Sequence, residues 1–88
     1  MRRRVSVFGA TGSVGRSTVA LLEAQGGVAA YEVVALSGAG NVALLAEQAR
    51  RLGARIAVTA DPTRLGALRA ALEGSGVEAA AGPAALVE

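Results

Sequence analysis

The apolar residues of this chain fall into short, valine-rich segments separated by longer segments with helical spacing. The short segments are bounded by glycine or by charged residues, a pattern that is typical of strands. Residues 33–36 are apolar at every position, as expected of a strand buried on both faces in a parallel sheet. The predicted strands span residues 5–8, 31–36, 55–59 and 77–81, and the last is weakly specified because alanine is a poor strand former.

The segments between these strands carry apolar residues three or four positions apart, which predicts amphipathic helices. Asn41 suits an N-cap, and the pair Asp61 and Pro62 suits an N-cap followed by a proline in the first helical turn. Gly26 and Gly53 stand where two of the helices would end. The predicted helices span residues 13–25, 42–52 and 62–73, and residues 84–88 are predicted to begin another.

Strand and helix thus alternate with about 25 residues to a unit, which predicts neighbouring parallel strands joined by right-handed crossovers. We expect the α/β class, as a Rossmann-like half-domain in which a parallel sheet of about four strands carries helices on both faces. The length of 88 residues suits one domain. Because the sequence stops inside a predicted helix, we expect residues 1–88 to be a domain truncated at its C-terminus.

A glycine-rich turn between the first strand and the first helix carries the main candidate chemistry. In residues 9–15, Gly9 permits a tight turn, Gly12 lets the backbone approach a pyrophosphate, and Gly15 allows close packing of the helix. The amides of Ser13 and Val14 open the helix, where the helix dipole favours an anion. The motif predicts a dinucleotide-binding turn, and the alternative is a glycine-rich turn that binds nothing. The predicted contacts are Gly9, Thr11, Gly12, Ser13, Val14 and Gly15, with hydroxyl donors on Thr11 and Ser13.

A second glycine turn, residues 37–41, indicates which dinucleotide is expected. NAD-binding domains place an Asp or Glu at the end of the second strand, where it binds the ribose 2′-hydroxyl. Here the turn contains no acid, and Ser37, Asn41 and the backbone can donate to a 2′-phosphate without charge repulsion. NADPH is therefore predicted rather than NADH. The turn holds neither Arg nor Lys, so a cation from elsewhere, such as Arg16, is expected to contribute.

The composition removes many kinds of chemistry. The chain is 52% hydrophobic and 18% charged with a net charge of +2, which argues against disorder. It has no cysteine and no histidine, so disulfides, thiol or histidine catalysis and the usual zinc sites are excluded. Asp61 is interpreted as a helix cap and not as a general base, and the sequence predicts no catalytic residue and no metal ligand in this chain.

Few features indicate a macromolecular partner or a membrane. The run Arg2-Arg3-Arg4 is interpreted as a solubilising flank of the first strand, and one Tyr and one Phe give no stacking surface for single-stranded nucleic acid. No apolar segment approaches the ~20 residues that cross a bilayer, and the N-terminus does not resemble a signal peptide. The expected partner is a small-molecule dinucleotide, with no nucleic acid and no membrane, and the expected location is cytoplasmic.

The order of the motifs resembles a known family. Residues 9–18 read Gly-Ala-Thr-Gly-Ser-Val-Gly-Arg-Ser-Thr, and they are followed by Tyr-Glu-Val-Val-Ala-Leu at 31–36, by Asn41, by the region of Gln48, and by Arg-Ile-Ala-Val at 55–58. This order resembles the N-terminal NADPH-binding domain of the 1-deoxy-D-xylulose 5-phosphate reductoisomerase family over essentially the whole chain.

The resemblance implies roles for individual positions. Thr11, Gly12, Ser13 and Val14 match residues that contact the phosphates and the nicotinamide side of the cofactor in that family. Ala39, Gly40 and Asn41 match residues that surround the 2′-phosphate. Gly40 departs from the family pattern, because many members carry Lys or Arg there.

The resemblance also implies the activity of the complete enzyme, an NADP-dependent oxidoreductase. Members of the family rearrange 1-deoxy-D-xylulose 5-phosphate and reduce it with NADPH to 2-C-methyl-D-erythritol 4-phosphate, aided by Mg²⁺ or Mn²⁺, in the non-mevalonate route to isoprenoid precursors. The metal ligands, the substrate site and the C-terminal domain are expected beyond residue 88, so the chain alone is expected to be inactive, and the full-length enzyme to be a homodimer. Two alternatives remain: an NADP-dependent reductase of the aspartate-semialdehyde dehydrogenase type, and a stand-alone nucleotide-binding module.

Overall fold

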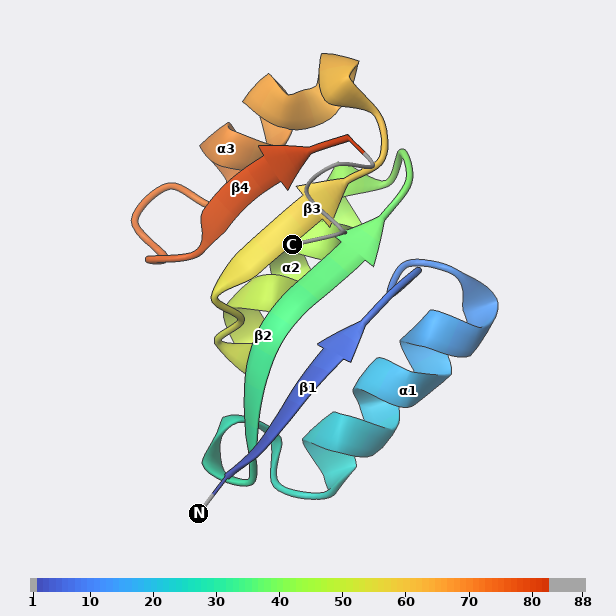
Figure 1. Cartoon of the computed structure of the whole chain (residues 1–88), viewed down its shortest axis with the longest axis vertical. Helices are drawn as coiled ribbons and strands as arrows, with labels where there is room; N and C mark the ends of the chain where they lie inside the picture. The colour runs from blue at the N-terminus through green and yellow to red at the C-terminus, as the bar shows by residue number, and fades with distance from the viewer. Residues whose placement is uncertain (1, 83–88) are drawn as a thin grey trace.

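The computed structural model describes residues 2–82, which form a four-stranded sheet in the order β1-β2-β3-β4 (Figure 1). Each neighbouring pair of strands is parallel. The strands are β1 (Arg3–Val7), β2 (Tyr31–Gly38), β3 (Ile56–Thr59) and β4 (Glu78–Ala81). All four predicted strands are confirmed, with ends shifted by no more than two residues. The helical turn predicted at residues 84–88 lies outside the described residues.

In this part of the chain the strands are connected by α-helices and by single turns of 3-10 helix. They are α1 (Ser13–Ala24), η1 (Gly27–Ala29), α2 (Val42–Leu52), η2 (Pro62–Arg64) and α3 (Leu65–Ala71). Asn41 caps α2 as predicted, because its Oδ1 accepts a hydrogen bond from the Leu44 amide at 3.2 Å. Gly53 ends α2 in the left-handed conformation, with φ at 62°. The third predicted helix is divided, since Asp61 caps η2 and the α-helix begins only at Leu65.

The three described α-helices share one face of the sheet. In Figure 1, α2 lies behind β2 and β3, and it contacts both strands as well as α3. A single core joins side chains of all three helices to the strands. The sequence suggests helices on both faces, whereas the strand order advances in one direction only. Right-handed crossovers in such an order place every connecting helix on the same face. The Rossmann-like α/β class with a parallel four-stranded sheet is confirmed.

A bulge in β2 directs two residues three positions apart into this core. Val5 of β1 pairs with Val33, but the next residue of β1 pairs with Ala35, so Val34 has no partner across the ladder. Val33 and Leu36 are 1% and 0% exposed, and both join the core beneath the helices. The alternation of β2 side chains between the two faces of the sheet is thus shifted by one residue. The shift occurs just before the carboxyl end of β2, where the candidate site lies.

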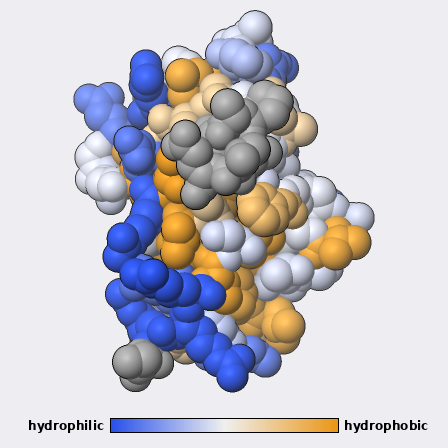
Figure 2. All heavy atoms as spheres, in the orientation of Figure 1, coloured by the Kyte–Doolittle hydropathy of each residue, from blue (hydrophilic) through white to orange (hydrophobic). Residues whose placement is uncertain are grey.

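The other face of the sheet is turned toward the viewer in Figure 2, which shows an apolar stripe with strongly hydrophilic residues along one side. At the amino end of the sheet, Glu32 makes ion pairs with Arg2, Arg4 and Arg55, at 3.9, 3.3 and 3.0 Å. Two arginines of the N-terminal run are therefore engaged with the surface of the domain itself. Within residues 2–82, no helix combines the length and the apolarity that a bilayer crossing demands.

Candidate functional site

The turn after β1 is fastened to the end of β2 by Ser37. The Gly9 amide donates a hydrogen bond to Ser37 Oγ at 3.0 Å, and the Ala10 amide donates to the Ser37 carbonyl oxygen at 2.6 Å. Gly9 makes the turn possible, because its φ of +72° is a conformation that other residues rarely adopt. Ser37 was expected to donate to a ligand, but its side chain is buried and already accepts from Gly9. The structure therefore gives Ser37 the task of holding the turn.

Two glycines allow this turn to lie close to its neighbours. A Cβ on Gly15 would overlap the carbonyl group of Gly9, so the close approach of α1 that was predicted at Gly15 is confirmed. A Cβ on Gly38 would lie 2.9 Å from Thr11 Oγ1, which places Thr11 directly beside the end of β2. The turn at residues 9–15 and the turn after β2 are thus brought together at the carboxyl edge of the sheet.

Gly12 is a glycine that the fold itself does not require. It is exposed, its φ of −78° suits any residue, and a Cβ there would make only an ordinary contact of 3.4 Å with the Gly9 carbonyl oxygen. Its absent side chain instead leaves the start of α1 open. Because the second glycine of dinucleotide-binding turns lets a pyrophosphate approach the backbone, the geometry at Gly12 matches that use.

The first turn of α1 presents its amides to the outside. Gly12 is the N-cap residue and, within residues 2–82, no side chain caps the amides of this turn. Ser13 and Val14 are exposed, and Val14 retains 79% of its accessible surface. Four amides at a helix start lack intrahelical partners, and the helix dipole adds positive charge there. The start of α1 can therefore bind a phosphate group.

The turn after β2 presents exposed backbone at the same edge. Ala39, Gly40 and Asn41 are all exposed. Thr59 Oγ1 at the end of β3 donates to the Ala39 carbonyl oxygen at 2.7 Å, which fixes the turn from beneath. Asn41 uses Oδ1 to cap α2, so the NH₂ group of its side chain remains the end that can donate to a ligand. The structure thus brings all the residues predicted for cofactor binding to two adjacent turns.

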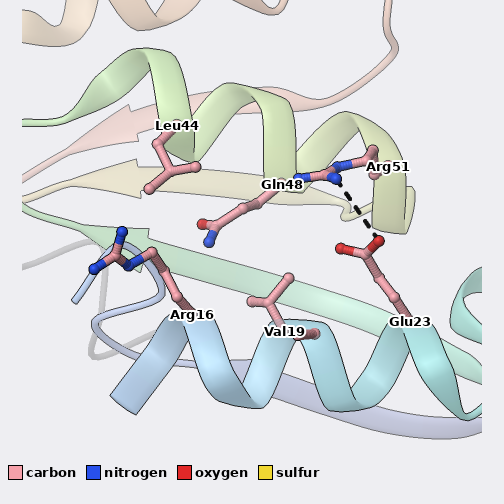
Figure 3. A pocket seen from close by; sticks show the side chains of 7 residues that line it. Arg16, Val19, Glu23, Leu44, Gln48 and Arg51 are labelled. Carbon is pink, nitrogen blue, oxygen red and sulfur yellow. Dashed lines mark ion pairs between the residues drawn. The ribbon is translucent and has the colours of Figure 1, made fainter. Parts of the chain in front are cut away.

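Sequence reasoning did not assign a role to Gln48, which supports the first turn from α2. Gln48 is 2% exposed, and its Nε2 donates to the Ala10 carbonyl oxygen at 2.8 Å. Gln48 lies in a groove between α1 and α2, together with Arg16 and Leu44 (Figure 3). The one available signal was a polar residue within the apolar face of a predicted helix.

Titratable groups near the site are few. Asp61 accepts hydrogen bonds from the Thr63 amide at 3.0 Å and from Thr63 Oγ1 at 2.7 Å, which confirms its role as a cap. Those bonds, the hydroxyl's first, and the nearby Arg64 guanidinium hold the pKa of Asp61 below its usual value. Among the described residues, no group of three or more carboxylate, histidine or cysteine side chains is placed to bind a metal ion.

The family model and the sequence relatives that match this chain belong to the same family. The family model of 1-deoxy-D-xylulose 5-phosphate reductoisomerase matches residues 5–88. The chain is 65% identical over 86 residues to the reductoisomerase of Ruegeria pomeroyi and 59% identical to that of Paracoccus denitrificans, covering 98% of this chain in both cases. It covers 21% and 22% of those two proteins, so it spans about a fifth of their length.

Solved structures agree with the sequence relatives. The reductoisomerase of Zymomonas mobilis in complex with NADPH superposes with a TM-score of 0.93 at 49% identity, covering 99% of this chain and 22% of that one. A reductoisomerase solved with NADPH, fosmidomycin and magnesium superposes with a TM-score of 0.86 at 25% identity, covering 98% of this chain and 21% of that one.

Proposed function

The chain belongs to the 1-deoxy-D-xylulose 5-phosphate reductoisomerase family, and from that premise we propose that it forms the NADPH-binding domain of such an enzyme. The observation that carries the proposal is the open start of α1 at Gly12, beside a neutral turn at the end of β2. The Zymomonas mobilis relative, which superposes on the whole described sheet, was solved with NADPH. The family match favours this assignment over a reductase of the aspartate-semialdehyde dehydrogenase type.

Each part of the site has a task in this proposal. Gly9 and Gly15 shape the first turn, and the amides of Ser13 and Val14 bind the pyrophosphate with help from the hydroxyls of Thr11 and Ser13. In the second turn, Ala39, Gly40 and Asn41 receive the adenosine 2′-phosphate. No acid lies in that turn to bind a free 2′-hydroxyl, which is why NADPH is proposed rather than NADH.

The complete enzyme would use this domain to hold the hydride donor. We propose the family's reaction for it: rearrangement of 1-deoxy-D-xylulose 5-phosphate, followed by reduction with the hydride that NADPH supplies, to 2-C-methyl-D-erythritol 4-phosphate. Residues 2–82 contain no group of three or more carboxylate, histidine or cysteine side chains that could hold the family's metal ion. We therefore assign no residue of this domain to that ion. We propose that the chain alone does not turn over substrate and that the full-length enzyme is a homodimer.

Calorimetric titration of the chain with NADPH, NADP⁺ and NADH tests the proposal. We expect NADPH and NADP⁺, which carry the 2′-phosphate, to bind more tightly than NADH, with one dinucleotide bound to each chain. Equal affinity for NADPH and NADH would refute the assigned cofactor, and the absence of any dinucleotide binding would refute the assigned site.

A further inference from the structure

Arg64, which follows Pro62 and Thr63 in η2, lies beside Gly40. A Cβ on Gly40 would be 3.5 Å from Arg64 Nε and 3.9 Å from Arg64 Cζ. The guanidinium group thus lies beside the turn at residues 39–41, which is proposed to receive the 2′-phosphate. We propose that Arg64 supplies the positive charge that recognises the adenosine 2′-phosphate in this protein, an inference that rests on the proposed binding of NADPH.

The sheet brings Arg64 to this place although 24 positions separate it from Gly40 in the sequence. β2 and β3 pair in parallel, so the turns that follow them leave the sheet side by side. Two hydrogen bonds fasten these turns together: Thr59 Oγ1 donates to the Ala39 carbonyl oxygen at 2.7 Å, and the Ala60 amide donates to the Gly38 carbonyl oxygen at 2.8 Å. The position of Arg64 beside Gly40 is therefore a consequence of the strand pairing.

Asp61 orients the Arg64 side chain without using all of its donors. Asp61 Oδ2 lies 3.4 Å from Arg64 Nε, and the other carboxylate oxygen is held by Thr63. Among residues 2–82, the ion pair of Arg64 engages Nε, so Nη1 and Nη2 are left to face a second anion. A guanidinium group bonds phosphate oxygens in a fixed fork geometry, and Arg64 is 53% exposed, so the phosphate can reach it. The Asp61 carboxylate thus acts as the support that holds the fork in place.

The structure distinguishes Arg64 from the other candidate cation. Arg16, which the sequence suggested, lines the groove between α1 and α2 with Leu44 and Gln48 (Figure 3). Arg64 instead lies beside Gly40, in the turn that the proposed 2′-phosphate would approach. A basic residue near the end of the second strand is the usual way in which such domains accept NADP.

The test compares affinities for NADPH and NADH in the wild-type chain and in Arg64→Met. Charge-assisted hydrogen bonds contribute enough that the variant should bind NADPH about tenfold more weakly or worse. Its affinity for NADH should stay within about twofold of the wild-type value, because NADH lacks the 2′-phosphate that Arg64 would contact. Arg69→Met, exposed in the last turn of α3, changes the net charge equally and should leave the ratio of the two affinities unchanged.

A second variant separates recognition from a structural effect. In Arg64→Met combined with Gly40→Lys, a cation returns to the same turn from the position beside Arg64, and the preference for NADPH should be regained. Gly40 tolerates the side chain, since its nearest neighbour is the Arg64 side chain at an ordinary distance of 3.5 Å and its φ is not positive.

The outcomes distinguish the two proposals. If the wild-type chain prefers NADPH and Arg64→Met keeps that preference, the inference about Arg64 is wrong while the NADPH site stands. If Arg16→Met loses the preference and Arg64→Met does not, the cation is Arg16. If the wild-type chain binds neither NADPH nor NADH, the proposed function fails and the inference fails with it.

Discussion

Gln48 donates a hydrogen bond from Nε2 to the carbonyl oxygen of Ala10 at 2.8 Å, across 38 positions of sequence. Both residues are buried, at 2% and 0% exposure. The bond joins the middle of α2 to the turn that follows β1. The turn is therefore held by two hydrogen bonds from other elements, one with Gln48 of α2 and one with Ser37 of β2. A dinucleotide would thus meet a turn that the fold has already placed, which reduces the ordering cost of binding.

Gln48→Met should destabilise the chain by about 1 kcal/mol: the buried Ala10 carbonyl oxygen would lose its donor, and this loss is partly offset because Gln48 Oε1, which is buried without a partner among residues 2–82, is removed. Urea denaturation followed by circular dichroism measures the change. Gln25→Met is the matched control, since Gln25 is exposed and, in the described part of the chain, its Oε1 accepts only from the Tyr31 hydroxyl at 2.8 Å. Equal losses in the two variants would show that the Gln48 bond does not hold the turn.

Gly12→Asp should change stability and dinucleotide binding in opposite directions. Asp is a favoured N-cap, and Gly12 already has the extended backbone of a cap, so the free energy of unfolding should rise by about 0.5 kcal/mol. The carboxylate would occupy the start of α1 and repel a pyrophosphate, so NADPH binding should be lost. Thermal unfolding and calorimetry on the same sample measure the two effects.

Ala70→Asp is the control for net charge in that experiment. Ala70 is exposed on α3, so this variant should bind NADPH as the wild type does. If Gly12→Asp bound NADPH normally, the pyrophosphate would not lie at the start of α1.

Gly15→Ala should destabilise the chain by about 1–3 kcal/mol, because the added methyl group would overlap the Gly9 carbonyl group and force α1 away from the turn. Gly66→Ala provides the contrast within α3. A Cβ there meets nothing within 4 Å, so that variant should be stabilised by about 0.5–1 kcal/mol through the lower entropy of its unfolded chain. Chemical denaturation of both variants tests the pair, and a stable Gly15→Ala protein would contradict the close approach.

The elements of the fold could be predicted from the sequence because their signals are local. The Asn41 cap, the left-handed Gly53 and the valine-rich segments each depend on a few adjacent residues. The two glycine turns were recognised for the same reason. The placement of the helices on one face could not be read from the sequence, because periodicity does not reveal the order of strands in a sheet.

The contacts that hold the site in place were not predicted, because they join residues that are far apart in the sequence. Gln48 reaches Ala10, and Arg64 reaches Gly40, only after the strands have paired. Ser37 shows a related limit. Its residue type and its place in a glycine turn indicated a ligand donor, but burial and the Gly9 amide give it an internal partner. The hydrogen-bond partner of a serine hydroxyl depends on tertiary packing, which the local sequence does not show.

Asp61 should make part of the chain's stability depend on pH. Its pKa is lowered from 3.8, chiefly by the hydrogen bond from the Thr63 hydroxyl, then by the Thr63 amide and by Arg64. A carboxyl group with a lower pKa in the folded state contributes stability above its unfolded pKa, and that contribution is lost as the pH falls through the folded pKa. Asp61→Asn keeps a capping oxygen but does not titrate.

The wild type should therefore be more stable than Asp61→Asn at neutral pH, and the difference should shrink as the pH falls below 3.8. Urea denaturation of both proteins over that pH range measures it. Glu73→Gln, which removes the same charge at an exposed position, should show no such convergence. A difference that stays constant down to the lowest pH would mean that Asp61 stabilises the turn as a cap alone, and that its charge contributes nothing to holding Arg64 beside Gly40.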